Sequence, residues 1–215
     1  MLIRMQTNAH RPRLLSLVLV LFATVGPAFA ERSVLQEEDG ITVEEQPEPG
    51  RTLPVLFGTT SISAPPERIA EWIEDVRTYP DWQHNCEEAR ALPQPDGTTL
   101  TYNRVGAPWP VSDRDVVLAS TRVDGEDGRI LIEFHETEAA NAPKDTGAVR
   151  MPRLRGSYDL TPTESGTHVV YMIDSDPGGS LPTWLVRQAS KDLPYETLKN
   201  LRARAEAGPP PTGDE

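Results

Sequence analysis

The stretch SLPTWLVRQASKDLPYETLKNLRARAEA, residues 180–207, carries apolar side chains at the spacing of one helical face. Leu185, Ala189 and Leu193 follow one another at intervals of four residues, and the series continues to Ala205. Residues three or four positions apart share one side of an α-helix. The stretch therefore predicts a long amphipathic helix at the C-terminal end of the fold.

Proline and serine set the expected limits of this helix. Ser180 is the expected N-cap, and Pro182 suits the first turn. Pro194 has no backbone N–H to donate, so we expect it to kink the helix after its third turn.

The sequence before this helix alternates between apolar and polar residues with a period of two, which is typical of strands. Turn sequences such as QPDG at 94–97 and TESG at 163–166 separate the runs, and such short connections predict antiparallel pairing. A shorter helix is expected at 66–76. The expected strands are 53–63, 87–92, 98–104, 115–123, 129–138, 148–160 and 167–175. One long helix packed on one antiparallel sheet predicts an α+β fold.

Residues 1–30 have the composition of a secretory signal peptide. Three arginines and no acidic residue come first, an apolar run follows at 14–25, and an A-x-A cleavage site ends at Ala30. A membrane-spanning helix needs about 20 apolar residues, and Gly26-Pro27 ends this run sooner. We expect cleavage between Ala30 and Glu31, and a mature chain that is periplasmic or secreted.

Three further segments lack a clear periodic pattern. The acidic segment 31–50 has few large apolar residues and is expected to pair weakly or to stay mobile. Residues 207–215 are rich in proline and glycine and are expected to form a disordered tail. The segment 138–147 is longer than a hairpin requires, so it is a candidate gating loop.

Charge and cysteine content limit the classes of function. The chain has a formal net charge of −12, and removal of residues 1–30 leaves 18 basic against 33 acidic residues, a charge near −15. Such a surface repels nucleic acid, so nucleic-acid binding is not expected. Cys86 is the single cysteine, which excludes an intramolecular disulfide.

Four segments, in order, resemble the START (StAR-related lipid-transfer) family within the wider helix-grip superfamily. They are YPDWQHNCEEARAL (79–92), WPVSDRDVV (109–117), VRMPRLRGSYDLTP (149–162) and DPGGSLPTWLVRQASKDLPYETLKNLR (176–202). The resemblance covers a domain at 33–206. It implies a helix-grip fold, in which a curved antiparallel β-sheet wraps around a long C-terminal α-helix and leaves an internal hydrophobic tunnel.

The triplet Asp113-Arg114-Asp115 allows two interpretations. Two carboxylates around a guanidinium could be catalytic, but the sequence offers no nucleophile or base to complete such a site. Arg114 could instead satisfy the carboxylates, as a structural ion pair, together with backbone carbonyls where a strand begins. We favour this structural clasp, and in the similar family the motif is likewise a fingerprint of the fold.

The candidate lipid-binding residues follow from strand parity together with the resemblance. We expect the tunnel lining to include Leu100, Tyr102, Leu118, Ile132, Phe134, Tyr158, Tyr171, Ile173, Trp184, Leu185 and Gln188. Tyr102, Tyr171 and Gln188 could orient the polar end of a ligand. The alternative is that these side chains form an ordinary core.

Metal and nucleotide sites are not predicted. The histidines at 84, 135 and 168 lack metal-ligand spacing, and DPGG at 176–179 lacks a phosphate-loop lysine. Cys86 is interpreted as a small buried apolar residue. We therefore expect no metal and no cofactor.

The resemblance implies a lipid-binding or lipid-transfer protein that holds one hydrophobic molecule and is not an enzyme. Its expected partner is a lipid or another hydrophobic small molecule, with transient membrane contact and a monomeric state. The alternatives are a helix-grip enzyme, a cyclase or hydrolase, acting in the same cavity, and an interaction module that uses the acidic surface.

Overall fold

The computed structural model describes residues 31–51 and 53–211, and the predicted signal peptide lies outside this part of the chain. Ten strands form one sheet in the order β1-β2-β3-β10-β9-β7-β6-β5-β4, in which neighbours pair antiparallel, and β8 pairs in parallel with β6. The strands are β1 (Ser33–Glu38), β2 (Ile41–Gln46), β3 (Val55–Ile62), β4 (Cys86–Pro93), β5 (Thr99–Val105), β6 (Arg114–Asp124), β7 (Ile130–Glu136), β8 (Val149–Arg150), β9 (Arg153–Thr163) and β10 (Gly166–Asp176).

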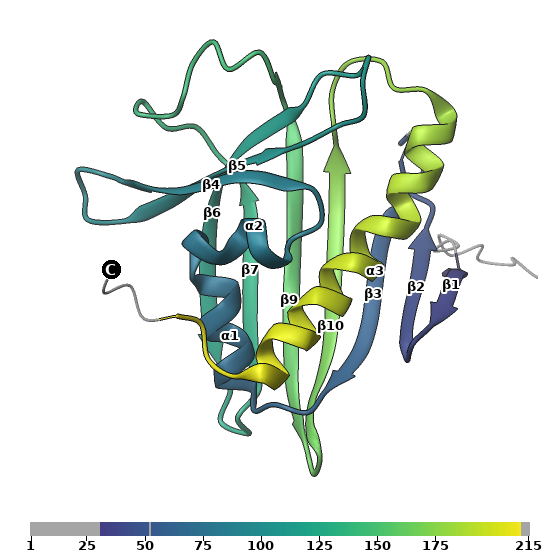
Figure 1. The fold of residues 1–215 in the computed structure, drawn as a ribbon, viewed down its shortest axis with the longest axis vertical. Coiled ribbons are helices and arrows are strands. Elements are labelled where there is room, and N and C mark those ends of the chain that lie inside the picture. Colours follow the sequence, from purple (N-terminus) through teal and green to yellow (C-terminus); the bar gives the residue numbers. More distant parts are fainter. Residues whose placement is uncertain (1–30, 52, 212–215) are drawn as a thin grey trace, which may run out of the picture.

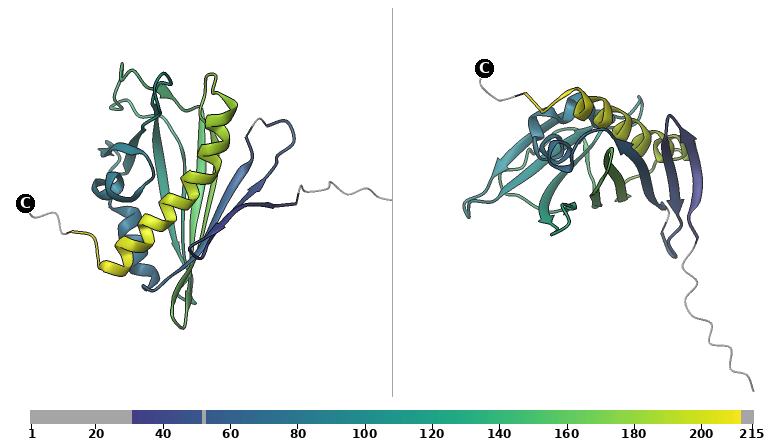
Figure 2. Two further views of the ribbon diagram at one scale, coloured as in Figure 1. Left: turned by 45° about the vertical axis from the view of Figure 1, so that its right-hand side comes forward. Right: turned by 90° about the horizontal axis from the view of Figure 1, so that it is seen from below.

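The sheet curves, and all the helices lie on its concave side (Figures 1 and 2). They are α1 (Pro66–Glu74), the 3₁₀ turn η1 (Val76–Thr78), α2 (Tyr79–Trp82) and α3 (Thr183–Ala207). The long helix α3 crosses the sheet diagonally (Figure 1). The predicted α+β helix-grip arrangement is thus confirmed.

The N-terminal segment corrects one expectation. Within the segment 31–50, which was expected to pair weakly or to stay mobile, residues 33–46 form the hairpin of β1 and β2 at the edge of the sheet, and β2 pairs with β3 over six residues. Asp39 and Gly40 make its turn with positive φ angles of 52° and 70°, which a tight hairpin favours. Ile41 and Val43, two residues apart, are completely buried in the main core. Two inward side chains thus anchor a segment of otherwise polar composition.

Helix α3 begins later than predicted. Pro182 occupies the N-cap position, and the helix starts at Thr183 without a side-chain cap, so Ser180 is not the N-cap. The helix continues through Pro194 as one element. Past its end, the carbonyl of Gly208 accepts a 2.9 Å hydrogen bond from the indole of Trp72.

The two halves of α3 differ in burial. The buried side chains of the helix begin at Pro194 and continue to Ala205, whereas residues 183–193 are exposed or half-buried. Gly58 of β3 permits the close packing of the second half, because a Cβ there would lie 2.7 Å from Leu198 and 3.2 Å from Pro194. The second half therefore closes the core, and the first half spans a space.

The connection at 138–147 packs on the other side of the sheet. Ala139 and Ala142 contact a small cluster that includes Tyr102 and Val117. Asn141 donates a 3.0 Å hydrogen bond to the carbonyl of Pro93. None of the residues 138–147 lines the cavity beneath α3, so the structure does not place this connection where the predicted gate would act.

Candidate functional site

A cavity of about 690 Å³ lies between the first half of α3 and the concave face of the sheet. Its walls come from β3, β4, β5, β6, β9, β10 and α3, so the helix and the sheet both contribute. The apolar side chains of the wall include Leu56, Val105, Val116, Ile173, Leu185 and Leu193. No helix in the described part of the chain is long and apolar enough to cross a membrane.

Tyr171 separates the cavity from the core behind it. Its ring stacks on that of Tyr158, with centroids 4.5 Å apart and planes 8° apart. Burial raises the pKa of both phenols well above the usual value, so both rings stay neutral. Both tyrosines belong to the main core, and Tyr171 also lines the cavity.

The structure brings together part of the predicted lining. Tyr171, Ile173, Leu185 and Gln188 line the cavity. The other predicted residues lie elsewhere: Ile132 and Tyr158 in the main core, Phe134 against it, Leu118 buried away from the lining, Leu100 and Tyr102 in the cluster on the other face, and Trp184 in a shallow surface hollow.

On strand β5, Asn103 and Val105 face the cavity, whereas the prediction placed the alternate residues, Leu100 and Tyr102, there. Val105 pairs with Arg114, and Asn103 pairs with Val116. Paired residues share a face of the sheet, and all four line the cavity. The inward assignment of Leu100 and Tyr102 is therefore wrong, since a shift of one position turns every side chain to the opposite face.

The predicted ion pair of Asp113, Arg114 and Asp115 is also wrong, although the expected hydrogen bonds from Arg114 to backbone carbonyls are present. Successive side chains of a strand point to opposite faces, and only Arg114 lines the cavity. Its guanidinium donates hydrogen bonds to the carbonyls of Ser112 (2.5 Å), Pro177 (3.3 Å) and Gly178 (3.2 Å). In residues 31–51 and 53–211, no carboxylate lies within ion-pair distance of Arg114.

The two carboxylates of the triplet have partners of their own. Asp113 accepts from Arg104 at 2.9 Å and from the backbone N–H of Ala107 at 3.1 Å. The hydrogen bond from Arg104 is the main cause that lowers the pKa of Asp113. Burial lowers the pKa of Arg114, and the nearby charge of Asp113 partly offsets that effect.

Asp115 is the centre of a buried network on the other face. Only 1% of it is exposed. It accepts hydrogen bonds from Arg150 at 2.6 and 3.2 Å, from Thr146 at 3.0 Å and from Tyr102 at 3.1 Å. Burial opposes ionisation, but these hydrogen bonds and the charge of Arg150 outweigh it, so the pKa of Asp115 is lowered. Asp115 therefore ties the connection before β8 to β5 and β6.

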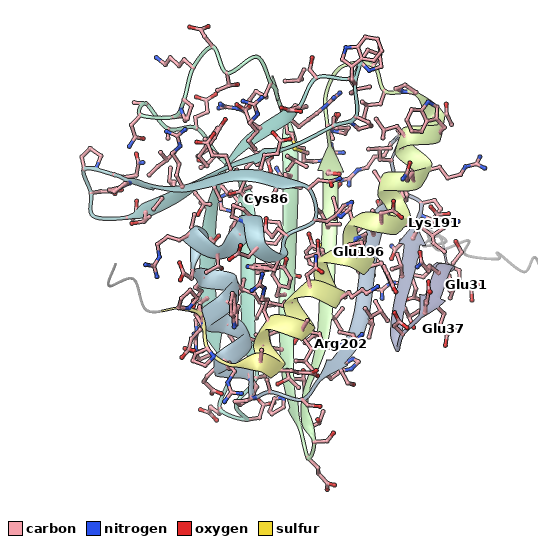
Figure 3. The ribbon with its side chains drawn as sticks, viewed as in Figure 1. Glu31, Glu37, Cys86, Lys191, Glu196 and Arg202 are labelled. Carbon is pink, nitrogen blue, oxygen red and sulfur yellow. The ribbon has the colours of Figure 1, made fainter. Side chains whose placement is uncertain are left out.

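Polar groups on the cavity wall include several that parity did not identify. Asn103 is buried, and its Oδ1 is the one buried side-chain oxygen or nitrogen without a hydrogen-bond partner in the described residues. Cys86, labelled in Figure 3, begins β4 on the same wall. Burial raises the pKa of its thiol to about 11 and lowers the pKa of the neighbouring His84.

Neither the thiol nor the imidazole is arranged for metal chemistry in the described part of the chain, where no three potential ligands gather. The buried thiol is protonated at neutral pH, so it lacks the thiolate that a nucleophile requires.

Sequence reasoning missed Asn103. Had the pairing of β5 with β6 been known, the alternation of β6 that begins at Arg114 would have identified Asn103 as a residue that faces the cavity.

Comparison with known proteins gives one family. The model described as START domain matches residues 32–208. An uncharacterized protein, PA1579, of Pseudomonas aeruginosa is 35% identical over 90% of this chain and 96% of its own length. The phosphatidylcholine transfer protein of Rattus norvegicus is 26% identical over 80% of this chain and 82% of its own length.

A solved structure agrees in fold and length. The STAR-related lipid transfer protein of Xanthomonas axonopodis, a fragment of residues 25–204, superposes with a TM-score of 0.72 at 30% identity. The match covers 81% of this chain and 98% of the fragment.

Proposed function

The chain belongs to the START domain family, and we propose that it is a lipid-binding and lipid-transfer protein that holds one hydrophobic molecule beneath the first half of α3. The observation that carries this proposal is the cavity of about 690 Å³, walled by apolar side chains from both helix and sheet. Small-molecule sites typically measure about 300–1,000 Å³ and are mostly apolar with few polar groups. Burial of a hydrocarbon chain there would contribute roughly 25 cal/mol per Å².

The alternative is a helix-grip enzyme, a cyclase or hydrolase, acting on a hydrophobic substrate in the same cavity. A general base works best with a pKa near the operating pH, and a nucleophile must be activated. Cys86 does not meet the second condition, because burial keeps its thiol protonated. The relatives from Rattus norvegicus and Xanthomonas axonopodis are both named as transfer proteins, which supports binding over catalysis.

We further propose transient membrane contact at the end of the molecule where α3 begins. The connection between β5 and β6 and the first turn of α3 both lie at this end (Figure 1). Trp109 in that connection is 93% exposed, and Trp184 in that turn is 60% exposed. Tryptophan favours the boundary between water and membrane, because its ring is apolar with one polar edge.

Lipid uptake and transfer test the function and the membrane contact together. The wild-type protein is expected to take up one fluorescent fatty acid per chain and to carry it from donor to acceptor vesicles. Trp109→Ala should slow transfer several-fold without changing the equilibrium affinity, because it removes membrane contact and leaves the cavity intact. Val123→Ala, at an exposed apolar position on β6, is the control. Equal transfer rates for all three proteins would contradict the membrane contact, and no uptake would contradict the function.

We also propose export, since the signal-peptide composition of residues 1–30 fits a protein that carries lipid through an aqueous compartment. The protein isolated from the host periplasm or medium is expected to begin at Glu31, and intact-mass measurement checks this. A full-length species retained in the membrane would contradict it.

The acidic charge of the chain favours solubility and disfavours binding of nucleic acid. We also propose that the carrier acts as a monomer.

A further inference from the structure

Arg114 is a buried cation that no carboxylate neutralises by direct contact. It is 8% exposed, and its three hydrogen bonds all go to backbone carbonyls. A guanidinium has five N–H donors, so these bonds leave two for another group. A buried charge is costly unless it is paired. The positive charge of Arg114 therefore stands at the wall of the cavity with capacity for an anion.

Asn103 adds a second group on the same wall. It is 6% exposed, and its Oδ1 has no hydrogen-bond partner in the described residues. Because Asn103 pairs with Val116 and Arg114 pairs with Val105, the two polar side chains are diagonal neighbours on one face of β5 and β6. A buried amide without partners costs stability, unless an occupant of the cavity bonds to it.

The two carboxylates that line the cavity have other neighbours. Glu87 lies 3.8 Å from Arg104, in an ion pair. Asp192, on α3, acts electrostatically on His84 and raises its pKa against the effect of burial. The lining also includes small and apolar residues, such as Ala107, Pro108 and Leu181.

We propose that Arg114 and Asn103 form a head-group subsite, and that the ligand is an amphiphile with an anionic carboxylate or phosphate. The spare donors of Arg114 bind the anion, and Nδ2 of Asn103 donates a hydrogen bond to the same head group. Oδ1 of Asn103 accepts from a hydroxyl where the head group carries one, and the hydrocarbon chain lies along Val116, Ile173 and Leu193. The subsite is at the end of the sheet where α3 begins, since Arg114 bonds to the turn before that helix. This inference rests on the proposed lipid binding and adds the chemical class of the ligand.

The test compares two probes that differ only in charge: cis-parinaric acid, which fluoresces by itself, and its methyl ester. At neutral pH the wild-type protein is expected to bind the acid about tenfold or more tightly than the ester, since charge-assisted hydrogen bonds are the stronger ones. Asn103→Leu should weaken binding of the acid several-fold, leave the ester unchanged, and raise the melting temperature of the empty protein. Asn141→Leu, outside the cavity, is the matched control.

Arg114→Gln should abolish the preference for the acid. If loss of its carbonyl bonds prevents folding, Asn103→Leu and the wild-type acid-to-ester ratio decide the question. Displacement by lysophosphatidic acid and by an unlabelled fatty acid of the same chain length then separates a phosphate ligand from a carboxylate ligand. Equal affinity of the wild type for acid and ester overturns the head-group subsite while lipid binding stands. Failure of every probe to bind overturns both.

Discussion

Asp115→Ala is expected to lower the free energy of unfolding by about 3 kcal/mol, because it removes the centre of a buried polar network. The substitution leaves Tyr102, Thr146 and Arg150 without their shared acceptor. For a domain of this size the melting temperature should fall by about 6–12 °C. Thermal and urea unfolding measure the effect. Asp81→Ala removes an exposed carboxylate from α2 and should change stability little.

The same substitution has a defined pH dependence. The pKa of Asp115 is lowered in the folded protein, so the unfolded state takes up the proton first as the pH falls. The stability that the ionised carboxylate contributes is fully present above the unfolded pKa of about 3.9 and is lost as the pH falls toward the folded pKa. The difference between wild type and Asp115→Ala should be constant from neutral pH to about pH 5 and shrink below about pH 4. A difference that grows on acidification would contradict the network.

Ala189→Trp is expected to weaken uptake of a fluorescent fatty acid by about tenfold to a hundredfold. Ala189 lines the cavity from α3, and its own position is exposed. An indole there occupies space that the ligand requires, whereas the empty fold loses no packed contact. Affinity should therefore fall while the melting temperature changes little.

The control for this substitution lies on the same helix. Ala203 is exposed and away from the cavity, so Ala203→Trp matches the change in composition and helix propensity. Titration of both variants with the same probe gives the comparison. If both bind like the wild type, the ligand does not occupy the space beneath the first half of α3.

The elements of the fold were largely predictable from period and turn chemistry. Each predicted strand from 53 to 175 has a counterpart in the sheet, and the long helix follows from one apolar face. The exception is the hairpin of β1 and β2. Average composition hides the two completely buried side chains of Ile41 and Val43, which lie two residues apart beside a tight turn.

The site was less predictable, because it depends on register. On β5 the predicted lining residue, Tyr102, faces away from the cavity, and the polar Asn103 faces into it. Sequence alternation alone does not tell which of two neighbouring residues turns inward. Alternation within β6 separates Arg114 from Asp115, but Asp113 precedes the strand, so its distance from Arg114 could not be read from the sequence.

Because the two halves of α3 are buried to different extents, the residence time of a ligand can change independently of the stability of the protein. The half from Pro194 onward is anchored in the core, and the half before it rests on the cavity. Pro194 cannot donate the backbone bond that would join the two halves at that turn. Movement of the first half alone would open the cavity and leave the side chains that the second half buries, such as Leu198 and Leu201, in place. Substitutions in residues 183–193 can thus change the residence time of the lipid while the folding equilibrium stays as it is.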